Sequence, residues 1–257
     1  SLEAIKKTLP DLRNKTIEFV VTRVSQFALD LQNGIISDAQ KVNKSLIKMC
    51  DACALIESFN DGQQRMVDTI DKHLFRQLYG KFKPGSKLGS LKFIDKRIKT
   101  YWQTMEIYNG LYSLFIPASW MVPVLLSTRF CQKTGESIKE QLLNYNEDVN
   151  IVKQSKQICI DFEKELYNDA VKFLNRSDTT CNMDSDDVKN NIASLKFEGI
   201  ISGVIDEYLN EYCSNLEYKT RECCEQSKIE TFDMLYNDGT LKNIIDNKAN
   251  IKKRLPS

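Results

Sequence analysis

The chain has 257 residues, of which 42% are apolar and 28% are charged, and its formal net charge is +1. This balance excludes an intrinsically disordered chain, which would carry fewer apolar residues, and is ordinary for a globular protein. The chain has only 10 glycines and 5 prolines, the residues that most often interrupt regular structure. We therefore expect long elements, and we expect them to be helices.

The charge is unevenly distributed along the chain. Residues 1–130 hold 19 Lys/Arg and 12 Asp/Glu (+7), and residues 131–257 hold the remaining 17 and 23 (−6). Either two faces of one globule attract each other, or a basic surface meets an acidic partner. We predict a single helical domain over 1–257, which could divide into sub-lobes 1–130 and 131–257.

The N-terminal third predicts three helices. The first begins near Pro10 and ends before Gly34, and the second has Ser37 as its N-cap and Gly62 as its stop. The third covers residues 63–79. Apolar residues recur three or four positions apart in each, the spacing of one helix face: Val20, Val24, Phe27 and Leu31; Val42, Leu46, Met49, Cys53 and Ile56; Met66, Ile70 and Leu74.

The segment GKFKPGSKLGS, residues 80–90, predicts a loop, and a long helical run follows from Leu91. Between Glu106 and Arg129 lies a stretch without formal charges. It is long enough to span a membrane, but polar residues and prolines interrupt it, so we expect no membrane insertion.

We expect this uncharged stretch to form the core. A helix would end near Ile116, turn at Pro117 and restart near Ala118, with Tyr112 and Trp120 as core anchors. A ligand- or lipid-lined pocket around 107–127 is the alternative.

The C-terminal half also reads as helical. Residues 134–174 predict one helix or two, interrupted near 144–146, and a polar loop covers 175–187. Helices then follow over 188–213 and roughly 217–250. The predicted fold is all-α, a bundle of about eight helices that is elongated or two-lobed.

Eight cysteines form an even set: Cys50, Cys53, Cys131, Cys159, Cys181, Cys213, Cys223 and Cys224. A zinc site fits poorly, because only one C-x-x-C pair and one histidine are present. We expect no metal and four disulfides, whose pairing the sequence leaves open among 105 arrangements. Disulfides imply an oxidising compartment, so we expect a secreted protein in a mature or trimmed form.

The basic segment 76–99 is the strongest candidate binding site. It contains one acid, Asp95, and eight basic residues: Arg76, Lys81, Lys83, Lys87, Lys92, Lys96, Arg97 and Lys99. Aromatic residues are interleaved with them, so the segment suits a sulfated sugar or an acidic protein face, and nucleic acid least. A solvated loop with its aromatics in the core is the alternative.

The sequence does not indicate an enzyme. A histidine-dependent nucleophile would have to use His73, and no phosphate-binding glycine loop or hydrolase motif is present. We therefore expect no catalytic residue and no cofactor. N-glycosylation sequons occur at Asn14, Asn43 and Asn175.

Several short motifs carry a resemblance to a known family: CDAC at 50–53, KFKPGSK at 81–87, lone mid-chain cysteines, and YKTRECCEQ at 218–226. In this layout the chain resembles the mosquito family known by its thirty-four-kilodalton salivary band. The resemblance implies a saliva component that binds a host or mouthpart protein and processes no substrate. It carries over no functional residues.

Three functions follow from this reading. The first is a secreted, non-enzymatic salivary protein that binds another protein during blood feeding. The second is a binder of a heparin-like anionic polysaccharide through 76–99. The third is a carrier of a small ligand or lipid in a pocket around 107–127.

Overall fold

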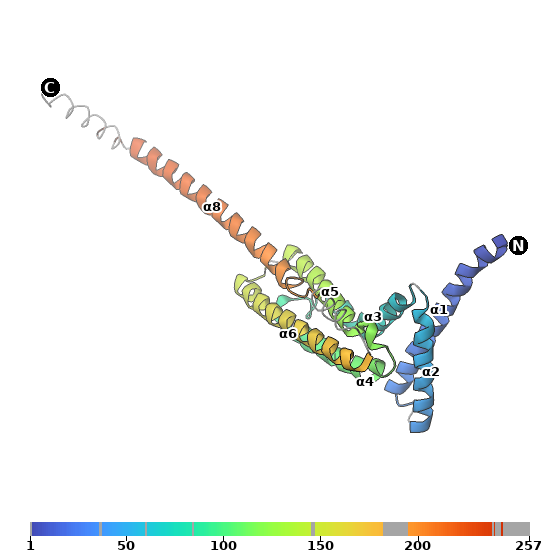
Figure 1. Ribbon diagram of the computed structural model, residues 1–257. Coiled ribbons are helices and arrows are strands. Elements are labelled where there is room, and N and C mark those ends of the chain that lie inside the picture. Colours follow the sequence, from blue (N-terminus) through green and yellow to red (C-terminus); the bar gives the residue numbers. More distant parts are fainter. Residues whose placement is uncertain are drawn as a thin grey trace. The chain divides into compact units, whose positions relative to one another are not determined.

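A computed structural model of the chain describes residues 2–35, 38–59, 61–83, 85–144, 147–181 and 195–237, with residues 239 and 243. Every regular element in these residues is helical (Figure 1), and seven of the elements are α-helices. The all-α prediction is therefore confirmed. The total of about eight helices and the overall shape stay predictions.

Contacts along the chain define two compact units, residues 1–206 and 207–257. The boundary falls inside the helix α8 (Ser202–Asn237), whose first turn packs with the first unit. The expected sub-lobes 1–130 and 131–257 stay a prediction.

The first helix, α1 (Leu2–Gln32), begins before Pro10 instead of at it. Residues 8–10 are exposed, so water can satisfy the carbonyl that loses its partner at the proline. The predicted end is confirmed, because Gly34 adopts a φ of +68°. Three of the four residues of the predicted stripe are buried: Val20, Val24 and Phe27.

The second helix, α2 (Ala39–Glu57), is capped by Asp38, whose side chain accepts a backbone N–H from the first turn. The predicted cap, Ser37, lies outside the described residues. Of the predicted stripe, Cys53 and Ile56 are fully buried.

The third helix, α3 (Gly62–Gly80), starts at the glycine that we expected only to stop α2. A Cβ atom at Gly62 would lie 2.3 Å from the Ile56 carbonyl oxygen. Glycine is needed here because the start of α3 passes against the last turn of α2.

The middle of the chain forms a short 3₁₀ turn, η1 (Leu91–Phe93), and two helices, α4 (Ile94–Leu111) and α5 (Val122–Asn144). Two further 3₁₀ turns, η2 (Tyr112–Leu114) and η3 (Ala118–Trp120), form the corner between α4 and α5.

The two predicted core anchors of the uncharged stretch are confirmed, although Ile107 and Leu114 in the same stretch are exposed. Tyr112 is 0% exposed and Trp120 is 2% exposed. The predicted break at Pro117 is present, although α4 already ends at Leu111 and α5 restarts only after Met121, which has a φ of 51°. Among the described helices, none combines the length and apolarity that crossing a membrane requires.

Two long helices complete the described part, α6 (Val149–Cys181) and α8. The predicted break between α5 and α6 is confirmed, because α5 ends at residue 144 and α6 starts at residue 149. The predicted loop over 175–187 is wrong up to residue 181, because α6 continues through it. Gly199, with a φ of +80°, precedes α8, which then runs unbroken through residues 213–217 where we expected a break.

An aromatic cluster joins four helices at the centre of the first unit. Its members are Phe75 on α3, Tyr101 on α4, Phe130 on α5 and Phe162 on α6. The Tyr101 and Phe130 ring centroids lie 4.5 Å apart, and those of Tyr101 and Phe162 lie 5.3 Å apart. The tilted and edge-on ring pairs suit aromatic packing, and they hold these four helices together.

Candidate functional site

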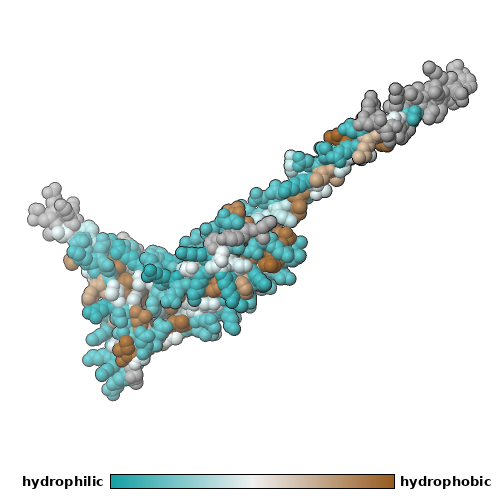
Figure 2. All heavy atoms as spheres, turned by 180° about the vertical axis from the view of Figure 1, so that it is seen from behind, coloured by the Kyte–Doolittle hydropathy of each residue, from teal (hydrophilic) through white to brown (hydrophobic). Residues whose placement is uncertain are grey.

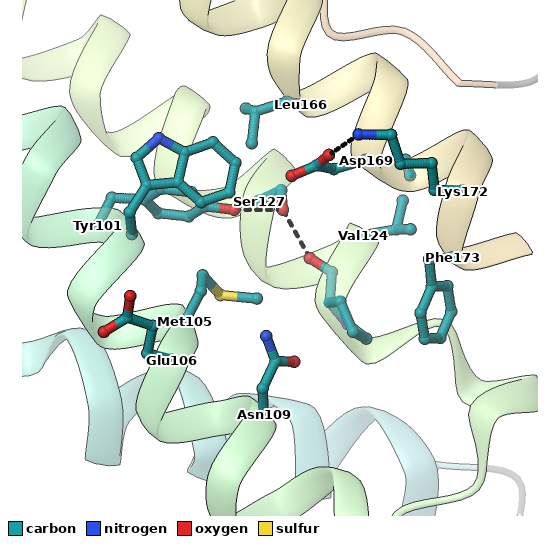
Figure 3. Close-up of a pocket in the computed structure, with 13 residues that line it drawn as sticks. Tyr101, Met105, Glu106, Asn109, Val124, Ser127, Leu166, Asp169, Lys172 and Phe173 are labelled. Atoms are coloured by element: carbon teal, nitrogen blue, oxygen red, sulfur yellow. Dashed lines mark hydrogen bonds and ion pairs between the residues drawn. The ribbon is translucent and has the colours of Figure 1, made fainter. Parts of the chain in front are cut away.

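A cleft of about 540 Å³ opens between α4, α5 and α6 (Figure 3). On one side, Ser127 Oγ donates to the Pro123 carbonyl at 2.7 Å and lies 2.6 Å from the Tyr101 hydroxyl, which therefore donates to it. On the α6 side, Lys172 Nζ donates to Asp169 Oδ1 at 3.0 Å. These polar groups are already paired with one another.

Tyr101 and Trp120 are both buried. Burial raises the pKa of Tyr101, so its hydroxyl stays protonated at neutral pH. Part of the segment 107–127 lines the cleft, but Trp120 does not: it is buried, and its Nε1 donates to Glu57 at 3.3 Å. The described residues also bring together no group of three or more metal-ligating side chains.

Seven of the eight predicted basic residues are exposed: Arg76, Lys81, Lys83, Lys87, Lys92, Lys96 and Lys99. They do not form one uniform patch. Lys83 shares a surface hollow with Glu140 and with the ion pair of Lys133 and Glu136. Lys87 and Lys96 instead lie near the Phe93 ring.

The eighth, Arg97, is fully buried and holds the loop in place. Its guanidinium donates to the carbonyls of Leu88 and Gly89, to the latter at 2.6 Å, and lies 4.5 Å from the Phe82 ring centroid. Burial lowers the pKa of Arg97 to about 10, so it remains charged at neutral pH. Arg97 is therefore an internal clamp and is not available at the surface.

The sequence contained a signal for this burial. Residues of α4 that face the core recur three or four positions apart: Ile94, Arg97, Tyr101, Met105 and Tyr108. Arg97 occupies a core position in this series, and we grouped it with the exposed lysines because of its charge alone.

His73 lies half-buried on α3, with Nδ1 2.5 Å from the Tyr112 hydroxyl, and is not part of the cleft. Burial lowers the pKa of His73 below its ordinary value of 6.5. The folded state thus binds fewer protons than the unfolded state in this range. The stability that His73 contributes in its neutral form is fully present above about pH 6.5. It is lost as the pH falls through the lower pKa that His73 has in the folded state.

We therefore expect the free energy of unfolding to fall on acidification partly through His73. Urea unfolding at neutral and mildly acidic pH should show a smaller loss in His73→Gln, which retains a hydrogen-bonding side chain without titrating. An equal loss in both proteins would contradict a contribution from His73.

The predicted disulfides are wrong for the cysteines that the structure describes. Seven are free thiols, and the side chain of Cys181 lies outside the described residues. Cys53, Cys131 and Cys159 are buried, and desolvation raises their pKa values, to about 12 for Cys53 and Cys159. These thiols stay protonated and pack as small apolar groups. The other four are exposed: Cys50, Cys213, Cys223 and Cys224.

The three sequon asparagines, Asn14, Asn43 and Asn175, are all exposed on helices. Asn14 Oδ1 accepts a hydrogen bond from Arg65 at 2.9 Å. Their glycosylation stays a prediction.

A long exposed surface on α8 was not anticipated from the sequence. Every residue from 213 to 235, which we call the α8 surface, is exposed. Large apolar side chains are among them (Figure 2), with Tyr218 68% and Met234 72% exposed. Exposed apolar side chains spread along a helix are typical of a surface that another chain covers.

One face of α8 carries no charge. Its residues recur at intervals of three or four, close to the 3.6-residue helical period. They are Leu209, Tyr212, Leu216, Thr220, Cys223, Ser227, Thr231 and Met234. The sequence already shows this spacing. The break that we expected between residues 213 and 217 divides the series into two helices, so the continuous face was missed.

The described chain is thus an all-helical protein with a long exposed helix. A sequence profile described as "Vps53, N-terminal" matches residues 2–231. Because this match covers most of the 257 residues, the chain belongs to the Vps53 N-terminal family.

One curated relative is "Vacuolar protein sorting-associated protein 53 A" of Arabidopsis thaliana, which is 26% identical over 125 residues. The match covers 47% of this chain and 15% of the relative, so it represents a small part of that protein's length. No solved structure matches the chain.

The family match corrects several expectations. The resemblance to the mosquito salivary family is wrong, and with it the secreted location and the role in blood feeding. The match also overturns three proposed functions. They are the binding of a host or mouthpart protein, the binding of a heparin-like polysaccharide, and the carriage of a small ligand or lipid. The quoted motifs did not match a salivary family motif position by position. The cysteine count suggested an oxidising compartment, which the free thiols do not support.

Proposed function

We propose that this chain is a non-enzymatic helical part of a subunit that acts inside the cell in vacuolar protein sorting, within a vesicle-tethering complex. The family match and the relative's name support this role. The observation that carries it is the uncharged face of the α8 surface, because an exposed helix face with apolar side chains such as Leu216 and Met234 suits assembly with another protein chain.

The partner that fits this surface is a helix of another subunit. The 23 residues from 213 to 235 span about 35 Å, enough for several turns of helix–helix packing. Fully burying a side chain such as Leu216 or Met234 contributes about 1.5–3 kcal/mol. The same residues hold three Lys/Arg (219, 221, 228) and five Asp/Glu (217, 222, 225, 230, 233), so a partner helix with an excess of basic residues would complement them.

We expect Leu216→Asp/Met234→Asp to reduce co-assembly at least tenfold, because it places two charges on the uncharged face. The matched control, Tyr218→Asp/Ile229→Asp, adds the same charge to other faces of α8 and should retain co-assembly. The measurement is quantitative mass spectrometry of the subunits that co-purify with the tagged full-length protein, with circular dichroism to verify helix content.

Two results would contradict the proposal. The first is a wild-type protein that co-purifies with no other trafficking subunit. The second is an equal effect of the two double variants, which would show that the uncharged face does not bind the partner.

A further inference from the structure

Two lysines lie near one aromatic ring at the start of α4, and two more lysines are close to them in the sequence. Lys87 Nζ lies 5.7 Å and Lys96 Nζ 4.7 Å from the Phe93 ring centroid. Lys92, Lys96 and Lys99 are spaced by four and three residues and so share one stripe. All four lysines are exposed and Phe93 is half-buried. We call these five residues the Phe93 surface.

The charge of the Phe93 surface is not neutralised within the described part of the chain. None of its four lysines is in an ion pair there, whereas Lys133, Lys156 and Lys172 each pair with a carboxylate. Asp95 is the one acid in the sequence between residues 81 and 99.

The position of these cations does not favour folding. The N-terminus of α4 is the positive end of the helix dipole, where carboxylates stabilise and cations destabilise. Lys92 lies in η1 immediately before α4, and Lys96 lies in its first turn. Stability of the helix therefore does not explain why lysines gather here.

The backbone under these lysines is held in place. Arg97 binds the Leu88 and Gly89 carbonyls next to Lys87. Ser90 Oγ accepts the Lys92 N–H at 3.4 Å, and Ser155 Oγ donates to the Leu91 carbonyl at 3.1 Å. The lysines thus extend from an ordered base, which reduces the entropy lost when they bind together.

We propose that the Phe93 surface docks on a negatively charged lipid bilayer. Lysine is a compact, hydrated point charge, suited to the diffuse negative charge of anionic headgroups. Protein interfaces instead favour arginine and deplete lysine, and the one arginine in the sequence between residues 81 and 99, Arg97, is buried. Docking of this kind is peripheral and needs no spanning helix. It goes beyond the proposed function and does not require the α8 partner.

Vesicle co-sedimentation of the 257-residue chain tests the proposal. The chain should bind phosphatidylcholine vesicles that contain phosphatidylserine, bind poorly without it, and dissociate as salt is added. Lys92→Gln/Lys96→Gln should bind more than tenfold weaker, since each lysine near an anionic membrane contributes about fivefold. The matched control is Lys44→Gln/Lys48→Gln, which removes the same charge from exposed positions on α2 and should bind within about twofold of wild type.

The melting temperature separates binding from folding. Lys92→Gln/Lys96→Gln should melt at the same temperature as wild type or higher, because it removes cations from a helix N-terminus. The α8 double variants should bind vesicles as the wild type does, so failure of subunit assembly is distinguishable from failure of docking.

Three results would overturn the proposal. One is no binding to phosphatidylserine vesicles at low salt. Another is an equal loss in the Lys44/Lys48 control, which would indicate net charge alone. The third is binding to polyglutamate without binding to vesicles, which would assign the Phe93 surface to an acidic protein segment.

Discussion

Replacing Glu163 by alanine should lower the free energy of unfolding by about 3–5 kcal/mol. The Glu163 carboxylate is 2% exposed on α6 and accepts four hydrogen bonds from the turn that starts α8. The donors are Gly199 N at 3.1 Å, Ile201 N at 2.6 Å, and Ser202 N and Oγ at 3.1 and 2.6 Å. Without the carboxylate these donors, of which those of Ile201 and Ser202 are buried, lose their acceptor, at about 1–3 kcal/mol for each buried one before water or local movement compensates.

Urea unfolding followed by circular dichroism measures this effect. Glu163→Gln retains one carbonyl oxygen and should lose less stability than Glu163→Ala. Glu165→Ala removes an exposed carboxylate from the same helix and should change stability by less than about 0.5 kcal/mol. Equal stabilities of the Glu163→Ala and Glu165→Ala variants would contradict the role of Glu163 as the anchor of the α8 start.

Arg97→Met should lower the free energy of unfolding by about 2–3 kcal/mol, although methionine is more apolar. The substitution removes the donors to the Leu88 and Gly89 carbonyls and to Ser137 Oγ, the last at 3.3 Å. It also removes the guanidinium from the Phe82 ring. Amide hydrogen exchange in residues 85–90 should accelerate, because the loop loses its internal clamp.

Two variants make this result specific. Arg97→Lys keeps the charge but cannot reach both carbonyls with one planar fork, so its stability should fall between wild type and Arg97→Met. Arg76→Met removes an exposed arginine from α3 and should change little. Unchanged exchange in residues 85–90 of Arg97→Met would show that Arg97 does not hold the loop.

Local sequence signals located the main breaks between helices. Gly34, the glycine-rich segment 80–90 and Pro117 each mark a break in the structure, because glycine and proline change which backbone conformations are open locally. Pro10 does not, because it lies inside α1. Long polar runs were less reliable. Residues 175–181 continue α6, because polar residues are compatible with a helix as well as with a loop.

The candidate sites were only partly predictable. The basic segment was found from composition, but its division into the exposed Phe93 surface and the buried Arg97 depends on which residues α5 and α6 cover. The cysteine count led to the wrong compartment because a count cannot distinguish buried thiols from paired ones. The α8 surface was missed because one helix was divided into two.

By itself the sequence determined that the chain is helical and where several helices end, since helical periodicity and backbone restrictions act over a few residues. Tertiary structure alone decided that Arg97 is a clamp, that Glu163 anchors the start of α8, and that the buried cysteines remain thiols. The anchor joins groups far apart in the chain, Glu163 and Ser202, whereas the clamp joins Arg97 to the nearby Leu88 and Gly89 carbonyls and to the distant Ser137. The spacing of the α4 core residues indicated that Arg97 is buried, but no local pattern records these hydrogen bonds.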